Sequence, residues 1–574
     1  VRREGAPQTS VTTLVAQPPR IRHQDQRQAS LVVAHQRLMM LMLLFAAVSI
    51  MIAGRLVWLS VFRDAKAVAS VSSLLPNRGD IVDRNGEVLA RTIDAWSIGV
   101  HANKLLNNPE DVAAKLAVLM PERTEAQYLA ILRSGVRFTY LRRRAMPDLV
   151  AQVNAIGEPA MAYAREPERL YPQTTLAAHV LGYTDFNGRG VSGMERVLDG
   201  KLSNSHTRAN PVALSIDARV QAIMESELSA AMVDQQAKGA TGIVLDVHTG
   251  EIVAMVSLPV YNPNKPGEGP DEARRNNVTQ SVYELGSTFK PITVANALDV
   301  GVVPSLSKRY DATGPLHVGK YTIHDDEPAG RWLNVVETLI TSSNIVTARI
   351  ADELGEARTA SLFRKLHFDT APDIELRERG RPIWPVYWGR TTVMTIGYGH
   401  GMAVTPLHLA TAYAALVNGG IFRPSTLLKI APGKAPHGTR VFSQATSDKM
   451  RQLLRMIVLD GTGRKANVEG LRIGGKTGTA EKAAGGGYNH HSTVSTFAAA
   501  FPMDAPRYVV IAMLDEPKGS AASSGQRTAA WTVAPVASKV IARIGPLLGI
   551  MPDSGKDIDV SALTPLVWKP KAGN

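Results

Sequence analysis

Apolar and polar residues follow three patterns along the chain, and the first is a long uncharged run near the N-terminus. Leu38 to Gly54 are 17 residues without a charge, and apolar residues continue beyond Arg55 to Phe62. At 1.5 Å per residue the extended run can cross a hydrocarbon core of about 30 Å, with Arg55 reaching to the far interface. The pattern therefore predicts one membrane-spanning helix over residues 37–62.

Basic residues predict the orientation of this helix. Residues 1–63 contain eight Arg, no Lys and two acids, which is a net charge of +6 out of +13 for the whole chain. The arginines between Arg20 and Arg37 precede the apolar run, so the positive-inside rule leaves residues 1–36 in the cytoplasm as a tail and exports the bulk of the chain. The length of the apolar run and of the basic segment before it favours an uncleaved anchor over a signal peptide.

The second pattern mixes short strands with amphipathic helices. Residues 78–89 are typical of two short strands around an Asn85-Gly86 turn. Helical periodicity follows at 111–120 and 125–133. The basic run 142–144 is expected on a solvated face.

The third pattern places strands at both ends of a helical middle, which is typical of an α+β domain of about 300 residues. A strand leads into a helix, a β-hairpin with apolar faces follows, and a last apolar strand comes much later. These elements are expected at 211–217, 218–232, 240–246 with 251–257, and 507–514. The end of the chain, from about 550, lacks helical periodicity.

Composition excludes several classes of protein. Hydrophobic residues make up 45% and charged residues 20% of the 574, which is a globular balance. Because the chain has no Cys, it has no disulfide scaffold, no cysteine nucleophile and no thiolate metal site. The basic excess is concentrated before residue 64, and no nucleic-acid-binding motif is present, so we expect no nucleic-acid partner.

Ser287-Thr288-Phe289-Lys290 opens a mostly apolar run that ends at Gly301. Residues three apart at a helix start share one face, so Lys290 can act as a base for the Ser287 hydroxyl when burial lowers its pKa. The helix N-terminus adds N–H groups where negative charge develops. A second Ser-x-x-Lys, at Ser305 and Lys308, lacks this context and shows that such spacing also occurs by chance.

Two further motifs carry polar groups suited to the same chemistry. Ser342-Ser343-Asn344 follows a helical stretch at 333–340 and supplies a hydroxyl and a carboxamide. Lys476-Thr477-Gly478-Thr479 combines a positive charge, hydroxyls suited to a carboxylate and a glycine that permits close backbone approach. Each motif alone is common in turns and strands, so their combination and order carry the inference.

The three motifs, in this order behind an export anchor, resemble those of the class B penicillin-binding proteins, and among them most closely the cell-division peptidoglycan D,D-transpeptidases. The resemblance extends over roughly residues 35–545. It includes the segments 78–86, 193–196, 283–291, 396–406, 460–463 and 515–519.

The resemblance implies an α+β chain with a single N-terminal transmembrane helix, an elongated non-catalytic pedestal and a penicillin-binding transpeptidase domain like that of the serine β-lactamases. The expected parts are a cytoplasmic tail, the helix, the periplasmic pedestal or dimerisation domain, the transpeptidase domain and a C-terminal tail. Their expected bounds are 1–36, 37–62, 63–212, 213–546 and 547–574.

The resemblance also implies catalytic roles. Ser287 is the expected acylated nucleophile and Lys290 its base. Ser342 is expected to relay protons to the leaving group, while Asn344 orients Lys290 and holds the substrate amide.

The third motif is expected to bind the substrate. Lys476 sustains a positive field, Thr477 and Thr479 bind the terminal carboxylate, and Gly478 lets the backbone approach. The backbone N–H groups of Ser287 and Thr479 form the expected oxyanion hole. No metal and no cofactor are expected.

The implied function is cross-linking of stem peptides at the division septum, with release of D-Ala, by an enzyme that β-lactams acylate. The expected partners are stem peptides on lipid II-derived glycan strands, the inner membrane, a separate polytopic FtsW-like glycosyltransferase and other division proteins. The catalytic domain is expected in the periplasm.

Two enzyme classes with related chemistry need sequence features that this chain lacks. A class A β-lactamase carries an Asp where this chain has Ser343, and a Glu-x-x-Leu-Asn segment that is missing after it. A bifunctional synthase needs a glycosyltransferase domain before the transpeptidase, whereas the 78–86 hairpin begins soon after the membrane segment.

An elongation-type class B enzyme and a non-enzymatic penicillin-binding protein would share the three motifs. The elongation-type enzyme has the same chemistry, and only the wording around Ser287 and in 380–406 favours division. A penicillin-binding sensor or scaffold keeps the fold, but here all three motifs are intact. The Gly-rich segment 481–496, with His490-His491, is expected to be a solvated loop rather than a metal site.

Protease treatment of spheroplasts tests the predicted topology. External protease is expected to degrade the chain beyond residue 70, because that part lies outside the cytoplasm, and to spare the N-terminal tail. Protection of the part beyond residue 70, together with cleavage of the tail, would contradict the predicted orientation.

Overall fold

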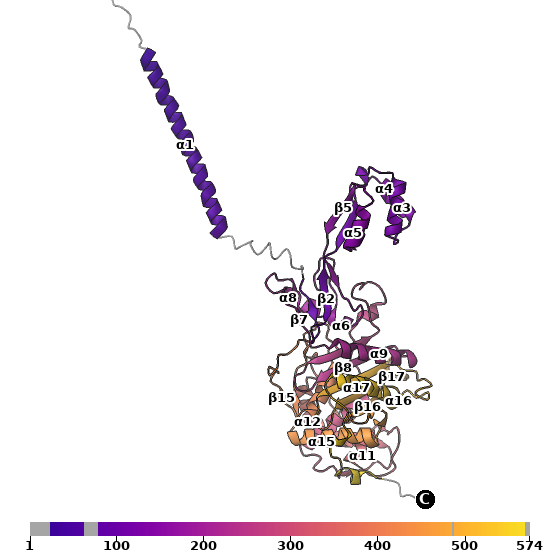
Figure 1. Ribbon diagram of the computed structural model, residues 1–574. Coiled ribbons are helices and arrows are strands. Elements are labelled where there is room, and N and C mark those ends of the chain that lie inside the picture. The colour runs from indigo at the N-terminus through magenta and orange to yellow at the C-terminus, as the bar shows by residue number, and fades with distance from the viewer. Residues whose placement is uncertain (1–22, 62–77, 485–486, 569–574) are drawn as a thin grey trace, which may run out of the picture. The chain divides into compact units, whose positions relative to one another are not determined.

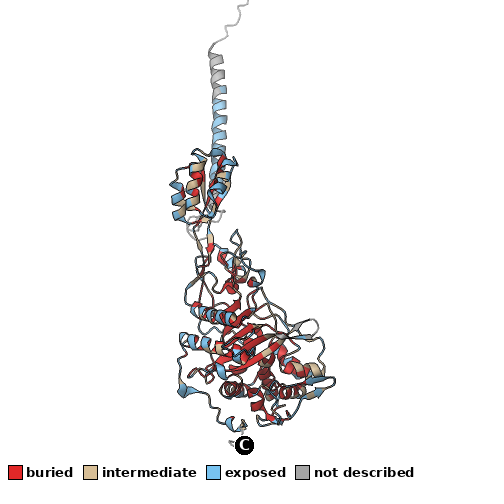
Figure 2. Ribbon diagram, turned by 90° about the vertical axis from the view of Figure 1, so that its right-hand side faces the viewer, coloured by how far each residue is buried: buried red, intermediate tan, exposed pale blue. Residues whose placement is uncertain are grey.

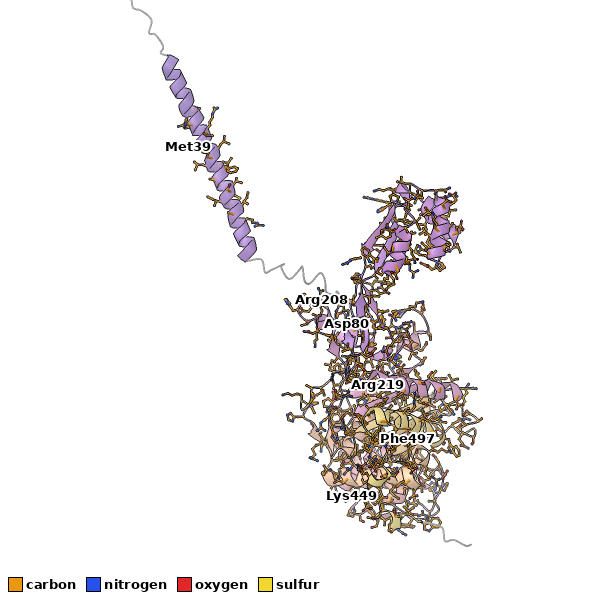
Figure 3. The ribbon with its side chains drawn as sticks, viewed as in Figure 1. Met39, Asp80, Arg208, Arg219, Lys449 and Phe497 are labelled. Carbon is orange, nitrogen blue, oxygen red and sulfur yellow. The ribbon has the colours of Figure 1, made fainter. Side chains whose placement is uncertain are left out.

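The computed structural model describes residues 23–61, 78–484 and 487–568, which form two compact units divided after Leu75. In the first unit, α1 spans His23–Val61 (Figure 1). Its apolar window, His35–Arg55, is long enough to cross a membrane. Met39 and its apolar neighbours are exposed along the helix (Figure 3), as side chains that face lipid are. Residues 37–61 of the predicted span are helical, but the helix begins earlier, at His23, and residue 62 lies outside the described residues. The bounds of the membrane-spanning segment stay a prediction.

The second unit begins with a small subdomain in which helices pack against a three-stranded sheet in the order β4-β3-β5. Asn108 and Thr124 cap the first two helices, and Thr124 forms a capping box with Gln127. The helices predicted at 111–120 and 125–133 are therefore confirmed to within two residues. The elements are β3 (Trp96–Val100), η1 (Ala102–Lys104), α3 (Pro109–Leu119), α4 (Glu125–Arg133), β4 (Thr139–Ala145), α5 (Pro147–Asn154) and β5 (Met161–Arg165).

The basic run 142–144 lies on β4 and is matched by acidic side chains. Arg142 pairs with Glu122 at 3.2 Å, and Arg143 pairs with Glu166. Both arginine side chains are exposed, so the expected solvated face is confirmed.

The expected hairpin forms the β1–β2 pair of a four-stranded sheet in the order β6-β2-β1-β7. Its strands are β1 (Ile81–Val82), β2 (Val88–Ile93), β6 (Glu168–Leu170) and β7 (Val212–Ala213). The Asn85-Gly86 turn is confirmed, with Gly86 at φ +94°. Asp83 stabilises the turn because its carboxylate accepts the N–H groups of Asn85 and Glu87. The strand predicted at 211–217 is shorter than expected.

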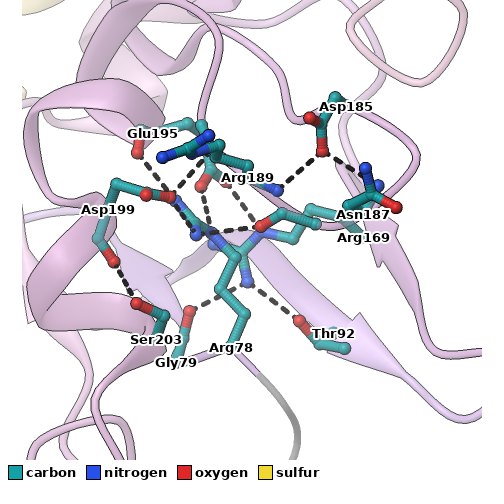
Figure 4. Close-up of polar contacts among 12 residues, drawn as sticks. Arg78, Gly79, Thr92, Arg169, Asp185, Asn187, Arg189, Glu195, Asp199 and Ser203 are labelled. Atoms are coloured by element: carbon teal, nitrogen blue, oxygen red, sulfur yellow. Dashed lines mark hydrogen bonds and ion pairs between the residues drawn. The ribbon is translucent and has the colours of Figure 1, made fainter.

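A buried ionic cluster joins this sheet to the short helices α6 (Ala178–Leu181), α7 (Gly193–Val197) and α8 (Asp199–Ser203). Glu195 accepts hydrogen bonds from Arg78 at 2.6 Å and from Arg169 at 2.7 Å (Figure 4). Asp199 binds Arg78 at 2.7 Å. Since Arg78, Arg169 and Glu195 are all buried, each charge depends on the others for its stability.

The C-terminal lobe, from α9 (Ala218–Asp234) onward, is built on a five-stranded antiparallel sheet in the order β16-β17-β18-β8-β9. The strands are β8 (Gly239–Asp246), β9 (Ile252–Leu258), β16 (Gly474–Ala484), β17 (Gly487–Phe501) and β18 (Tyr508–Asp515). The predicted hairpin and the late strand are thus confirmed.

Helices cover both faces of this sheet, and its strands β8 and β18 are buried over almost their whole length (Figure 2). α9 (Ala218–Asp234) and α17 (Ala534–Leu547) pack on the face that contains Phe497 (Figure 3). α14 (Pro406–Val417) packs on the opposite face, within the larger hydrophobic core. The expected α+β class is confirmed.

The remaining elements lie between and after these strands. The helices are α10 (Lys290–Asp299), α11 (Val335–Ile340), α12 (Asn344–Lys365), α13 (Arg390–Gly397), α15 (Gln444–Asp460) and α16 (Ala529–Thr532). The short strand pairs are β10 (Arg309–Tyr310) with β13 (Leu333–Asn334), β11 (Leu316–Val318) with β12 (Tyr321–Ile323), and β14 (Ile421–Phe422) with β15 (Thr439–Arg440). The 3-10 turns are η2 (Asp271–Arg274), η3 (Gly286–Phe289), η4 (Arg464–Ala466), η5 (Ser554–Lys556) and η6 (Thr564–Leu566).

The segment 481–496 is not the solvated loop that the sequence predicts. It forms the outer part of a β-hairpin in which β16 and β17 pair out to Ala484 and Gly487. The ladder satisfies backbone groups that a Gly-rich sequence was expected to leave to water. Residues 485–486 and the side chains of His490 and His491 lie outside the described residues.

The C-terminal segment after α17 packs against the lobe that contains the five-stranded sheet. Asp557 binds the buried Arg455 at 2.6 Å. Farther along, the carbonyl of Leu566 accepts a 2.6 Å hydrogen bond from Asn334. These contacts hold the segment against the lobe. Its described residues form only short 3-10 turns, which agrees with the lack of helical periodicity in the sequence.

The buried ionic cluster predicts a large effect of Glu195→Gln on stability. The neutral side chain leaves two buried guanidinium groups facing a single amide oxygen, which is expected to destabilise the pedestal by roughly 3–5 kcal/mol. Urea denaturation monitored by circular dichroism measures the change. Glu122→Gln, at the exposed pair with Arg142, is the control and is expected to cost at most about 1 kcal/mol. Equal effects of the two substitutions would contradict this account.

Candidate active site

Ser287 lies in a 3-10 turn rather than in the first turn of an α-helix. The turn η3 ends at Phe289, and α10 begins at Lys290. Side chains three apart in a 3-10 turn eclipse one another, so the predicted common face is preserved by a different geometry. Among the described residues, the half-buried Ser287 hydroxyl has no hydrogen-bond partner.

Glycines bring this turn against β16. Gly286 has φ +51°, and a Cβ there would lie 2.7 Å from the carbonyl oxygen of Thr479. A Cβ on Gly478 would lie 2.6 Å from the carbonyl oxygen of Leu285. Both contacts are too close for any side chain, so the glycines permit the approach that places the first and third motifs side by side.

Lys290 extends from the start of α10 toward the second motif. Its Nζ donates a 2.7 Å hydrogen bond to Oδ1 of Asn344 and a 3.1 Å bond to the Ser342 hydroxyl, and it also contacts the Ser342 carbonyl. Complete burial lowers the pKa of Lys290 to about 7, although the charges of Asp325 and Asp326 oppose the shift. The predicted contact with Asn344 is confirmed, and Lys290 is poised between its two protonation states at neutral pH.

The Ser342 hydroxyl connects the two motif lysines. Lys476 is fully buried on β16, and its Nζ donates a 2.9 Å bond to the same Ser342 Oγ that Lys290 contacts. Burial lowers the pKa of Lys476 well below its ordinary value, and the nearby Lys290 lowers it further. Two ammonium groups around one hydroxyl repel each other, so the site does not favour full protonation of both.

Ser342 adopts an unusual backbone conformation in the turn between α11 and α12. Its φ is +61°, a left-handed conformation that costs a non-glycine residue energy. The next residue, Ser343, caps α12 through a hydrogen bond from the N–H of Val346. The turn directs Ser342 toward both lysines.

Asp325 supports the second motif and was not found by the sequence reasoning. It is buried and accepts hydrogen bonds from the Ser343 hydroxyl at 2.7 Å and from the Ile345 N–H at 2.9 Å. The preceding carbonyl, of His324, accepts a 2.9 Å bond from Nδ2 of Asn344. Asp325 and Asp326 follow β12 in a short loop. No sequence pattern links this loop to residues 342–344, so the contact is visible only in the structure.

The third motif presents its hydroxyls from the edge strand β16. Oγ1 of Thr477 lies 2.8 Å from Oγ1 of Thr462, a second residue that the sequence reasoning missed, in the segment 460–463. Oγ1 of Thr479 accepts a 3.0 Å bond from the N–H of Ala529. Because that contact uses Thr479 as an acceptor, its own proton remains available to a ligand.

A cavity of about 510 Å³ adjoins the end of this motif. Its wall includes Tyr283 and Glu284, just before the nucleophile turn, and Glu481, just after the third motif. Glu284 accepts 3.0 Å bonds from the Gly401 N–H and from Nδ1 of His400, which fixes one wall.

The second Ser-x-x-Lys has no such surroundings. Ser305 bonds Ser307 at 2.8 Å, and Lys308 pairs with Glu353 at 2.7 Å. The hydrogen bond and charge of Glu353 contribute to a raised pKa for Lys308, which is the opposite of what a base at neutral pH needs.

All eight sequence-predicted site residues come from the three motifs that the structure brings together around Ser342. In the part of the chain that the structure describes, no group of three or more His, Cys, Asp or Glu side chains is placed to hold a metal ion.

Comparison with known families agrees with this geometry. The family described as the penicillin-binding protein transpeptidase domain matches residues 240–538, more than half of the chain. The chain belongs to this family. The penicillin-binding protein dimerisation domain matches residues 73–206, which include the pedestal elements. The boundaries expected near 212 and 546 stay predictions.

Similar proteins cover most of the chain. A probable peptidoglycan D,D-transpeptidase FtsI of Caulobacter vibrioides is 42% identical over 483 residues, 82% of each chain. The peptidoglycan D,D-transpeptidase FtsI of Escherichia coli K12 is 28% identical and covers 87% of this chain and 90% of its own. A crystal structure of penicillin-binding protein 3 from Mycobacterium tuberculosis, complexed with ampicillin, is 25% identical, with a TM-score of 0.66 and coverage of 84% and 98%.

Proposed function

We propose that the chain is a serine-type peptidoglycan D,D-transpeptidase that cross-links stem peptides through an acyl-enzyme on Ser287. The observation that carries the proposal is the Ser342 hydroxyl, which bridges the buried Lys290 and Lys476 beside the nucleophile turn. This arrangement supplies a nucleophile, a base near neutrality and a path for the proton between them.

Acylation begins when neutral Lys290 takes the proton of the Ser287 hydroxyl. Oγ of Ser287 attacks the carbonyl carbon of the penultimate D-Ala, and the oxyanion forms at the N–H groups of Ser287 and Thr479. The C–N bond to the terminal D-Ala then breaks. Ser342 passes a proton to the leaving amine and takes one from protonated Lys290. The D-Ala departs as a neutral amine, Lys290 is neutral again, and the ester remains on Ser287.

The ester is released by an amine from a neighbouring stem. The amine attacks the carbonyl carbon, loses its proton through Ser342 and Lys290, and displaces Oγ of Ser287, which regains a proton. A β-lactam enters by the same first step, but its amide opens within a ring, so the leaving nitrogen stays attached to the adduct.

Lys290 does not contact Ser287 in the free site, because Asn344 and Ser342 hold its Nζ. Catalytic hydrogen bonds commonly tighten only when substrate is bound. Nδ2 of Asn344 donates one hydrogen bond to the His324 carbonyl, and its second N–H remains available to donate to the substrate amide carbonyl.

The third motif suits the terminal carboxylate of the donor stem. Thr477 and Thr479 present hydroxyls from one strand, and Lys476 supplies positive potential when the site is protonated. A peptide without the carboxylate would forgo these hydrogen bonds and the favourable charge, so the motif selects peptides with a free C-terminus.

The proposed setting is the division septum, with the tail in the cytoplasm and the catalytic lobe in the periplasm. The apolar helix α1 and the basic residues before it support a single-pass anchor in the inner membrane. The relatives named FtsI support division over elongation. Glycan polymerisation is assigned to a separate FtsW-like glycosyltransferase, and other division proteins complete the assembly.

The pKa of Lys290 predicts the pH dependence of penicillin acylation. The neutral amine is the base, so the rate rises as pH increases through about 7 and then levels off. Asp325→Asn removes a charge that raises this pKa, so the midpoint moves to lower pH.

Stopped-flow measurement with a fluorescent penicillin gives the profile. Glu353→Gln, which removes the carboxylate that binds Lys308 and Tyr310, is the control and keeps the midpoint unchanged. A midpoint near the ordinary lysine pKa of 10.5 would contradict a base whose pKa burial has lowered.

Ser287→Ala tests the nucleophile directly. Penicilloyl adduct formation and D-Ala release are expected to disappear, while the fold persists because this hydroxyl makes no hydrogen bond among the described residues. Mass spectrometry after incubation with penicillin measures the adduct, and Ser305→Ala is the matched control that keeps it. An adduct on the Ser287→Ala protein would show that another serine is the nucleophile.

A further inference from the structure

The loop formed by residues 377–388, here called the rim loop, exposes apolar side chains outside the catalytic cleft. Val386 is fully exposed, Tyr387 is 79% exposed and Ile383 is 62% exposed. Three large apolar side chains within six residues form a surface of the kind that binds a ligand. Nothing in the proposed chemistry uses Val386 or Tyr387.

The rim loop is held in place at its base. The N–H of Gly380 donates a 2.8 Å bond to the carbonyl of Thr279, and the Thr279 hydroxyl donates a 2.6 Å bond to the Glu378 carbonyl. The N–H of Ile383 bonds the carbonyl of Ala403 at 2.8 Å. A surface that is already ordered loses little conformational entropy when a ligand binds.

Aromatic packing supports the tip of the loop. The rings of Trp384 and Trp388 lie 5.1 Å apart, and the guanidinium of Arg364 lies 5.6 Å from the Trp384 ring. These contacts stabilise the backbone on both sides of Val386 and Tyr387.

The rim loop is continuous with the wall of the cavity beside the active site. Ile383 lines this cavity together with Tyr283 and Glu284, which precede Ser287 by four and three residues. Backbone pairing connects Ile383 to Ala403 and Tyr283 to Val404. A chain that leaves the cavity past Ile383 therefore meets the exposed side chains of the rim loop.

Charge favours an anionic ligand at the base of the same loop. Residues 377–381 contain three arginines and one glutamate. In the described part of the chain, neither Arg377 nor Arg381 pairs with an acid, and both are exposed. Peptides with free carboxylates complement this surface.

We infer that the rim loop binds the glycan strand whose stem peptides enter the active site. This inference rests on the proposed function. The apolar faces of sugar rings pack on Tyr387 and Val386, while Arg377 and Arg381 face carboxylates of the attached stems. The covalent link between stem and glycan supports this occupant over a protein or a lipid surface, because a stem bound at Ser287, beside the cavity that Ile383 lines, brings its glycan with it.

The test separates the polymer from the small substrate. In the full-length chain in detergent, Val386→Ser/Tyr387→Ala is expected to label with fluorescent penicillin, and to release D-Ala from a free stem pentapeptide, at the unaltered rates. Its rate of cross-linking un-cross-linked glycan strands that carry pentapeptide stems is expected to fall about tenfold, the effect of losing a central apolar contact. Phe186→Ala is the matched control, because Phe186 is also 79% exposed but lies in the pedestal.

A binding measurement makes the test independent of turnover. Ser287→Ala chains with and without the rim-loop substitutions are sedimented with glycan strands stripped of their stems, and the substitutions are expected to weaken binding about tenfold. Unchanged binding and cross-linking in the substituted chain would overturn the inference. So would unchanged glycan binding accompanied by loss of self-association or of binding to lipid vesicles, which would assign the surface to a second copy or to the membrane.

Failure of the proposed function gives a different result. In that case the unaltered chain itself neither labels with penicillin nor releases D-Ala from the pentapeptide, whatever the rim loop binds.

Discussion

The contact of one serine hydroxyl with two buried lysines is the constraint on which the active site depends. Ser342 lies 3.1 Å from the Nζ of Lys290 and 2.9 Å from that of Lys476, and both lysines are fully buried. Burial of an ammonium group is costly unless its charge is compensated, so the pKa of each lysine falls. A site that destabilises its own protonated form keeps a base ready at neutral pH. The surrounding packing keeps both lysine side chains out of contact with water.

The three motifs lie close together because, at two positions, glycines let one backbone segment pack directly against another. Gly286 and Gly478 let the nucleophile turn and β16 approach to distances at which a Cβ would clash. The left-handed conformation of Ser342 raises the energy of the folded chain locally. The cap of α12 and the hydrogen bonds of the buried Asp325 hold the backbone in this conformation. Tight packing and strain therefore concentrate around the three motifs, while the sheet behind them is an ordinary apolar core.

Sequence patterns predict the parts of this structure that depend on local chemistry. The apolar helix and the Asn85-Gly86 hairpin follow from spacing and side-chain type. The three motifs were assigned from their order and their resemblance to a known family, and the structure brings them together. Asp325 and Thr462 escape prediction because their role arises from contacts between segments that no local pattern connects. The hairpin over 481–496 was predicted wrongly as a loop because glycine-rich composition obscured a strand whose stability comes from its partner strand.

The proposed enzyme must acylate at Ser287 and must also hold a polymeric substrate, and we assign the second task to the rim loop. In the proposed chemistry a β-lactam needs only the groups that the three motifs supply, namely the Ser287 nucleophile and the Thr479 hydroxyl for its carboxylate. A polymer must in addition be held so that one stem among many stays in the cavity while a second approaches. Local binding of the strand raises the effective concentration of its stems without changing the chemistry at Ser287. Residues outside the cleft can therefore control cross-linking of the natural substrate and leave penicillin acylation unchanged.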